Sequence, residues 1–152
     1  MDLSARAPPA RYAFCAVVKS APDASSHQIY MFSGIEANLS SSGSGVVSGP
    51  TAQSIWVLTI PTFDWIPLDS SGDDAKGPGG RIAPACSTIG EHFVLSYGGR
   101  KTQGLPFDVE CDDKANAAYL FDLNTLSWTD QFEPNQGTYE VPKKVYDVIG
   151  GK

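Results

Sequence analysis

Short apolar segments separated by turn residues dominate the pattern of this chain. Runs of four to eight residues rich in Ile, Val, Phe, Tyr and Trp lie between clusters of Gly, Pro, Ser and Asp, which is typical of β-strands. Residues 55–58 and 119–121 are apolar without alternation, which favours strands covered on both faces. A single helix is predicted over residues 142–149, because proline suits a first turn and Gly150-Gly151 follows.

Part of this pattern occurs twice. Residues 55–65 align without gaps on residues 118–128, and each copy is an apolar strand, a short turn and a Trp that opens a second strand. Upstream of each copy the order is also the same: an arginine, a cysteine-containing strand, and an apolar strand that ends in glycine. Each unit therefore carries four candidate strands, and such repeats bury their faces against one another.

The repeat divides the chain into five parts. We expect an N-terminal linker over residues 1–10, a first unit over 11–70, a linker over 71–80, a second unit over 81–133, and a C-terminal segment with the short helix over 134–152. Long polar stretches, 38–53 and 100–116, interrupt the two units and are expected to form surface loops.

Composition and charge exclude some classes of protein. The chain has 152 residues, 41% of them hydrophobic and 18% charged, with a formal net charge of −6. Nucleic acid is not an expected partner, because neutralising phosphates requires clustered Lys and Arg. No run approaches the roughly 18 apolar residues of a membrane span. The first nine residues lack the apolar core of a signal peptide, so nothing in this chain predicts export.

The three cysteines leave at least one without an intramolecular partner. Cys15 and Cys86 fall in corresponding strands, where a cysteine is often a small buried hydrophobe. Cys111 lies in an acidic loop of the second unit. We expect Cys86 and Cys111 to form a disulfide if the protein meets an oxidising compartment, since they belong to one unit.

No residue is predicted to be catalytic, to bind a cofactor or to hold a metal. His27 and His92 are the two histidines and occupy matched points of the two units, which favours a structural role over metal ligation. The glycines of 77–80 lack the Lys-Ser/Thr of a phosphate loop and are interpreted as a linker. The acidic residues of 69–74 and 108–113 lack the spacing of a calcium loop.

Four-stranded units of this kind resemble kelch repeats. The resemblance covers roughly residues 11–132 and is strongest in the second unit; the first unit departs from it at Ser33-Gly34, where the family has two glycines. The residues assigned to the structural motif are Arg11, Gly34, Trp56, Trp65, Arg81, Gly98, Gly99, Tyr119 and Trp128. The second half looks like the last blades of fungal kelch-repeat proteins, in which a secreted propeller precedes a membrane span.

The resemblance implies an all-β fold of two four-stranded antiparallel propeller blades, a partial propeller with a short C-terminal helix. Because propellers close with about four to eight blades, further blades or self-association are expected to cover the faces of these two. The expected function is a non-catalytic protein-interaction module, with 40–45 and 107–113 as candidate binding loops. The alternative is part of a secreted propeller oxidase or a carbohydrate-binding cell-wall protein. A secreted or cell-surface location is implied for a full-length relative, and the Asn38 sequon matters only there.

Overall fold

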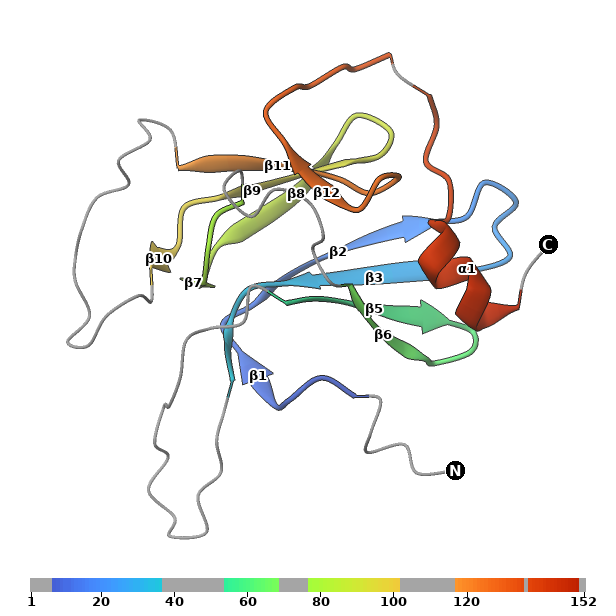
Figure 1. The fold of residues 1–152 in the computed structure, drawn as a ribbon, viewed down its shortest axis with the longest axis horizontal. Helices are drawn as coiled ribbons and strands as arrows, with labels where there is room; N and C mark the ends of the chain where they lie inside the picture. The colour runs from blue at the N-terminus through green and yellow to red at the C-terminus, as the bar shows by residue number, and fades with distance from the viewer. Residues whose placement is uncertain (1–6, 37–53, 69–76, 102–116, 136, 151–152) are drawn as a thin grey trace, which may run out of the picture.

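The computed structural model describes residues 7–36, 54–68, 77–101, 117–135 and 137–150 (Figure 1). These residues form two four-stranded antiparallel sheets that lie side by side, and one short helix. The first sheet, the first blade, has the order β2 (Cys15–Ser20), β3 (His27–Phe32), β5 (Ile55–Ile60) and β6 (Trp65–Leu68). The second blade has the order β8 (Ala85–Ile89), β9 (Phe93–Tyr97), β11 (Ala118–Asp122) and β12 (Ser127–Thr129). The predicted all-β fold with two four-stranded units is confirmed.

Two short strand pairs were not predicted. β1 (Arg11–Tyr12) pairs with β4 (Ile35–Glu36), and β7 (Arg81–Ile82) pairs with β10 (Arg100–Lys101). Each pair continues the first hairpin of its blade beyond a break. The break falls at Ala13 in one unit and Ala83 in the other, with φ of 53° and 52°. Alanine rarely adopts this left-handed conformation, so the sequence alone does not predict an interruption there.

Strand register gives each blade two distinct faces. In the first blade the inner face, which points toward the second blade, carries a set of buried apolar residues: Cys15, Val17, Tyr30, Phe32, Ile55, Val57, Ile66 and Leu68. The alternate residues form the outer face, where Trp56 and Leu58 are half-buried. The expectation that residues 55–58 are covered on both faces is therefore wrong, because β5 alternates between buried and half-buried side chains.

Aromatic rings join the blades at the centre of the core. The ring of Phe32 lies edge-on to Phe121 and to Trp128, with centroids 5.4 Å and 6.1 Å apart. Phe121 and Trp128 are direct neighbours on β11 and β12, with centroids 5.0 Å apart. Edge-to-face pairs at these distances stabilise a core beyond the area that they bury. The interface is thus a continuous hydrophobic core shared by both blades.

The helix α1 (Lys143–Ile149) follows Pro142 and ends at Gly150, whose φ is 71°. Proline at its start and glycine at its end confirm the helix predicted from the sequence. The segment before it bridges the blades: Asn124 of the second blade donates to the Thr138 carbonyl and accepts from the Glu140 amide, while Tyr139 reaches the first blade. Val145, on α1, is fully buried in the shared core. The C-terminal segment therefore holds both blades.

Candidate functional site

The two motif arginines have the same structural role in each blade. Arg11 donates from Nη1 to the Ser33 carbonyl at 3.1 Å, and Arg81 donates from Nη1 to the Gly98 carbonyl at 2.8 Å. Both carbonyls lie at the turn that ends the second strand of a unit. Arg81 is 1% exposed and also donates from Nη2 to the Tyr119 hydroxyl. Buried guanidinium groups need several acceptors to offset desolvation, so these arginines order the turns.

The motif glycines are explained by close backbone approach. A Cβ added to Gly34 would lie 2.8 Å from the Tyr12 carbonyl oxygen, and one added to Gly99 would lie 2.9 Å from the Ile82 carbonyl oxygen. The residue before each glycine is Ser33 or Gly98, with φ of 56° and 66°. Both positions adopt the left-handed region that glycine favours. Ser33, where the kelch pattern has glycine, keeps the same backbone geometry.

The motif aromatics differ in burial between the blades. Trp128 is 9% exposed and lies on the inner face, where its indole packs against Gly77. Tyr119 lies beside it and under the Arg81 guanidinium, 5.1 Å from the ring centroid. Trp65 and Trp56 occupy the corresponding positions of the first blade but lie on its outer face, and both are half-buried. Motif residues at equivalent positions of the two blades are therefore buried to different extents.

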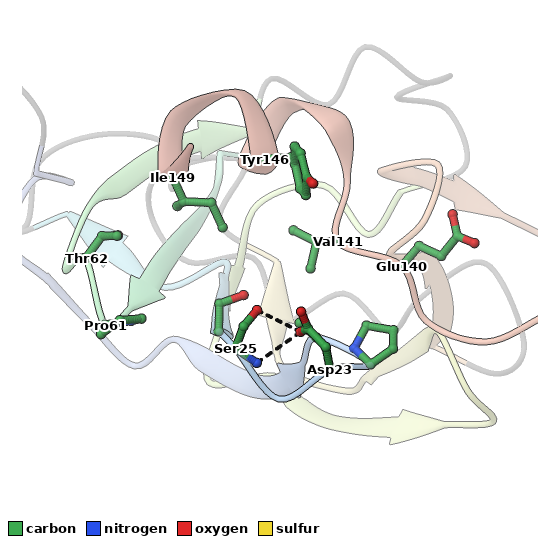
Figure 2. A pocket seen from close by; sticks show the side chains of 11 residues that line it. Asp23, Ser25, Pro61, Thr62, Glu140, Val141, Tyr146 and Ile149 are labelled. Carbon is green, nitrogen blue, oxygen red and sulfur yellow. Dashed lines mark hydrogen bonds between the residues drawn. The ribbon is translucent and has the colours of Figure 1, made fainter. Parts of the chain in front are cut away.

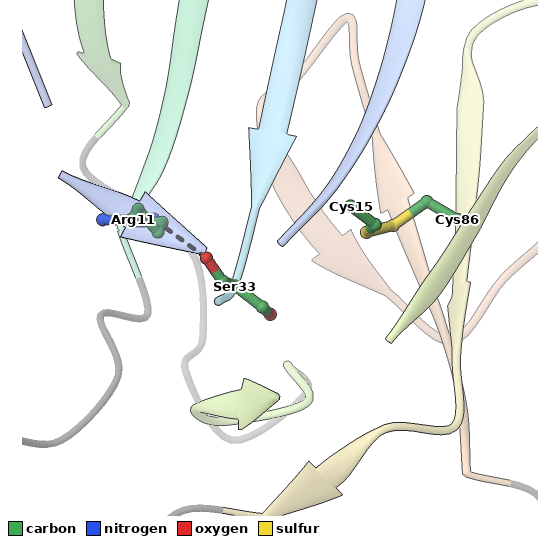
Figure 3. The surroundings of a disulfide bond; sticks show 4 residues. All are labelled: Arg11, Cys15, Ser33 and Cys86. Carbon is green, nitrogen blue, oxygen red and sulfur yellow. Dashed lines mark hydrogen bonds between the residues drawn. A yellow bond between two sulfur atoms is a disulfide. The ribbon is translucent and has the colours of Figure 1, made fainter. Parts of the chain in front are cut away.

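The cysteine pairing differs from the expected one. The structure joins Cys15 to Cys86, with Cα atoms 5.7 Å apart (Figure 3), which contradicts the expected bond from Cys86 to Cys111. Cys111 lies outside the described residues. Cys15 is four positions after Arg11 and Cys86 is five after Arg81. The spacing from arginine to cysteine thus differs by one residue between the two repeats, and a shift of one residue moves a side chain to the other face of a sheet. Cys15 and Cys86 therefore lie on opposite faces of their own blades, and these are the two faces that meet at the blade interface.

Both histidines lie near the ends of strands. His27 is 2.8 Å from the Ser20 hydroxyl through Nδ1. His92 is 4% exposed and its Nε2 lies 3.8 Å from a carboxylate oxygen of Asp122. They belong to different blades. In the described ranges no three His, Cys, Asp or Glu side chains come together as a metal site.

A groove opens at the end of the first blade that carries its short turns. It has a volume of about 710 Å³ and is formed by three segments: the β2–β3 turn, the β5–β6 turn, and the C-terminal segment with α1 (Figure 2). Tyr146 and Ile149 extend from α1 on one side, and Asp23 and Ser25 lie on the other. The sequence gives no signal for this groove, because its walls come from segments far apart in the chain.

A buried polar cluster underlies the C-terminal segment. The hydroxyls of Tyr30 and Tyr139 lie 2.7 Å apart, and the Tyr139 hydroxyl donates to the side-chain oxygen of Gln28 at 3.1 Å. Burial raises the pKa of Tyr139 to about 12 and raises the pKa of Tyr30 well above its ordinary value. Both phenols stay neutral at physiological pH, so the cluster holds the segment in place.

Several predicted features lie outside the described residues. These are the candidate binding loops 40–45 and 107–113, the acidic residues of 69–74 and 108–113, and the Asn38 sequon. Within the described part of the chain, α1 is too short to cross a membrane and no other helix is present.

Comparison with known proteins agrees with the repeat. The chain is 31% identical, over 169 aligned positions, to a kelch repeat-containing protein of Arthroderma benhamiae. The alignment covers 97% of the chain but only 23% of that relative. No family model matches the chain. The expected relationship to kelch-repeat proteins is confirmed, and the chain spans about a quarter of the relative's length.

Proposed function

We propose that this chain supplies two neighbouring blades of a kelch-type propeller and acts as a non-catalytic protein-interaction module. The observation that carries the proposal is the outer face of the first blade. It is the repeat equivalent of the face by which the second blade packs on the first. Such a face is expected to dock on another apolar sheet.

The equivalence holds strand by strand. Leu58 and Trp65 are paired neighbours on β5 and β6, as Phe121 and Trp128 are on β11 and β12. In the second blade this pair is covered by Phe32. In the first blade Leu58 and Trp65 are half-buried, and Val18 on the same face is 55% exposed. Contiguous apolar surface of this kind marks an interaction site.

The outer face of the second blade offers a complementary surface. A shallow hollow of about 320 Å³ lies there, lined by apolar and polar side chains that include Leu95, Leu120 and Phe132. Tyr97, on the same face, is 47% exposed. This face is the repeat equivalent of the first blade's inner face. Each blade therefore has two different faces, one equivalent to the inner face of the first blade and one equivalent to its outer face. The first kind packs on the second kind of the next blade, which is the arrangement that lets propeller blades stack around an axis.

Two considerations support an interaction role over catalysis. Each histidine already has a local neighbour at its own strand end, Ser20 for His27 and Asp122 for His92. The motif residues Arg11, Arg81 and Trp128 are engaged in turns and packing. The alternative, part of a propeller oxidase or of a carbohydrate-binding cell-wall protein, would draw its ligands from other segments; copper bound stoichiometrically to this chain would favour the oxidase.

We also propose that the protein meets an oxidising compartment. The Cys15–Cys86 bond links the two blades, and structural disulfides persist mainly in secreted and cell-surface proteins. Mass mapping of the natural protein without reduction tests this, because a free Cys15 in material purified from its source would contradict it.

Sedimentation velocity tests the proposed docking face. We expect the oxidised 152-residue chain to self-associate with rising concentration through its outer faces. The substitution Val18→Lys places a charge on the exposed outer face and should shift the chain toward monomer. Thr125→Lys, at an exposed turn, is the control and should leave association unchanged. A monomer at every concentration, or equal effects of both substitutions, would contradict the proposal.

A further inference from the structure

We infer that the groove between α1 and the β2–β3 turn binds an extended peptide segment of a partner protein through an arginine flanked by apolar residues. The groove is separate from the two outer faces, so this inference goes beyond the proposed docking of blades. It lies at the end of the first blade where β2 turns into β3 and β5 turns into β6. Glu36 and Ser54, which flank the candidate loop 40–45, lie at the opposite end of the strands.

The size of the groove fits a peptide side chain and its neighbours. Ligand sites commonly enclose about 300–1,000 Å³, and this groove has about 710 Å³. Its lining includes apolar side chains from two directions: Pro61 from the β5–β6 turn, and Val141 and Ile149 from the C-terminal segment. Val141 and Ile149 are half-buried, so they retain apolar surface for a ligand to cover.

Charge complementarity identifies the occupant. Asp23 and Glu140 both line the groove and both are exposed. Among the described residues, neither carboxylate is joined to a cation in an ion pair; Lys143 of α1 bonds instead to Asp147. The chain as a whole has a net charge of −6. A basic ligand therefore gains two carboxylate acceptors that no cation of the described residues occupies.

The Asp23 carboxylate is held in place for such a ligand. Its Oδ1 accepts from the Ser25 amide at 3.0 Å and from the Ser25 hydroxyl at 2.7 Å (Figure 2). These hydrogen bonds, the hydroxyl foremost, lower the pKa of Asp23, so the group is ionised at neutral pH. Both hydrogen bonds from Ser25 end on Oδ1, which leaves Oδ2 to accept from a ligand.

Arginine suits the remaining walls better than other cations. Tyr146 is half-buried and lies across the groove from Asp23, where a guanidinium can stack on its ring. The alkyl stem of arginine packs on apolar side chains while its charged end stays near solvent. The planar guanidinium also carries five N–H donors, so one arginine can donate to Oδ2 of Asp23 and still have donors for a second acceptor. Apolar residues beside the arginine would cover Val141 and Ile149.

A peptide titration tests the inference. The probe is acetyl-Leu-Arg-Leu-amide, and its neutral counterpart carries citrulline in place of arginine. Amide spectra of the oxidised, ¹⁵N-labelled full chain are recorded at low salt. We expect saturable shifts at Ser25, Thr62, Val141 and Tyr146. The arginine peptide should bind roughly fivefold more tightly than the citrulline peptide, because an exposed ion pair contributes at most about 1 kcal/mol to the binding free energy.

Two double variants separate the groove from a general effect of charge. Asp23→Asn with Glu140→Gln should reduce the preference for arginine to less than about twofold. The matched control, Glu91→Gln with Glu133→Gln, removes the same charge from exposed positions outside the groove and should leave the preference intact. Circular dichroism confirms that both variants are folded.

Each other outcome would overturn the inference. Equal binding of the two peptides would show an apolar site without charge recognition. Equal losses in the two double variants would show a long-range effect of net charge. Shifts confined to the outer faces, or no saturable shift up to about 10 mM peptide, would show that this groove is not the site. Because the sedimentation test probes different residues, either proposal can fail alone.

Discussion

Trp128 and Trp65 occupy the same place in the repeat but differ in their surroundings. Each pairs with an apolar residue of the preceding strand, Phe121 or Leu58. Trp128 is 9% exposed because Phe32 of the other blade covers it. Trp65 is half-buried, on a face that no other described sheet covers. The repeat fixes which side of the sheet the ring occupies, and the neighbouring blade decides how far it is buried.

The turns that precede these tryptophans show the same contrast. Phe63 and Leu126 correspond in the repeat and share a left-handed backbone, with φ of 58° and 55°. Leu126 is half-buried and packs against the shared core, whereas Phe63 is 69% exposed. Local sequence thus determines the backbone of the turn, while contacts from outside the blade determine the cover of its side chain.

The largest expected difference comes from removing each tryptophan. Trp128→Ala should lower the free energy of unfolding by about 3–5 kcal/mol, because it removes a ring packed between both blades. Trp65→Ala should lower it by about 1–2 kcal/mol, since the half-buried ring loses less packing. Urea denaturation followed by circular dichroism measures both. Equal costs would break the comparison, because they would place the two rings in equivalent surroundings.

The disulfide gives the next largest effect. The bond joins residues 71 positions apart, and closing a loop of this length in the unfolded chain stabilises the fold by about 2–4 kcal/mol. Cys15→Ser with Cys86→Ser should lower the free energy of unfolding by that amount. Cys111→Ser is the control and should change it little. A larger loss of stability from Cys111→Ser than from the double variant would contradict the bond between Cys15 and Cys86.

Tyr139→Phe tests the hydrogen bonds that join the C-terminal segment to the first blade. It removes the hydroxyl that contacts Tyr30 and donates to Gln28, and leaving such buried partners unsatisfied costs about 1–3 kcal/mol. Tyr12→Phe, at a position 45% exposed, should be nearly neutral. Thermal or urea unfolding gives the free energy of unfolding of the two variants. Similar values would show that the hydrogen bonds of Tyr139 do not contribute to stability.

A smaller effect is expected at alkaline pH. The pKa of Tyr139 is raised by burial to about 12 in the folded chain, above the value of about 10 for an exposed phenol. The stability from this neutral hydroxyl is fully present below about pH 10 and is lost as pH rises from there to about 12. Absorbance near 295 nm should show Tyr30 and Tyr139 ionising after the exposed tyrosines. Tyr139→Phe should be less sensitive across this interval.

Sequence reasoning found the features that repeat and missed those that depend on contact between units. The blades, the helix and the motif residues follow from local patterns of strand, turn and glycine. The Cys15–Cys86 bond did not, although its signal is present: the spacing from the preceding arginine differs by one residue between units. Counting from Arg11 and Arg81 places the two thiols on opposite faces, and hence on facing sides of one interface.

The groove and the buried polar cluster cannot be predicted from residue spacing. Tyr139 meets Tyr30 across 109 positions, and no repeat or motif relates these residues. The side chains of Pro61 and Tyr146 share a groove only because α1 returns to the first blade. The path of a non-repeating segment over a repeating one is set by tertiary packing, which a pattern of apolar residues does not specify.

The most direct test of the account is fluorine NMR of the full oxidised chain labelled with 5-fluorotryptophan. The chain has three tryptophans: Trp128 lies on the inner face, and Trp56 and Trp65 lie on the outer face. Resonances are assigned by replacing each with Phe, and spectra are recorded as protein concentration rises. The account predicts that the resonances of Trp56 and Trp65 shift with association while that of Trp128 stays fixed. A shift of Trp128 alone, or association that leaves Trp56 and Trp65 unchanged, would contradict the claim that the outer face is a docking surface.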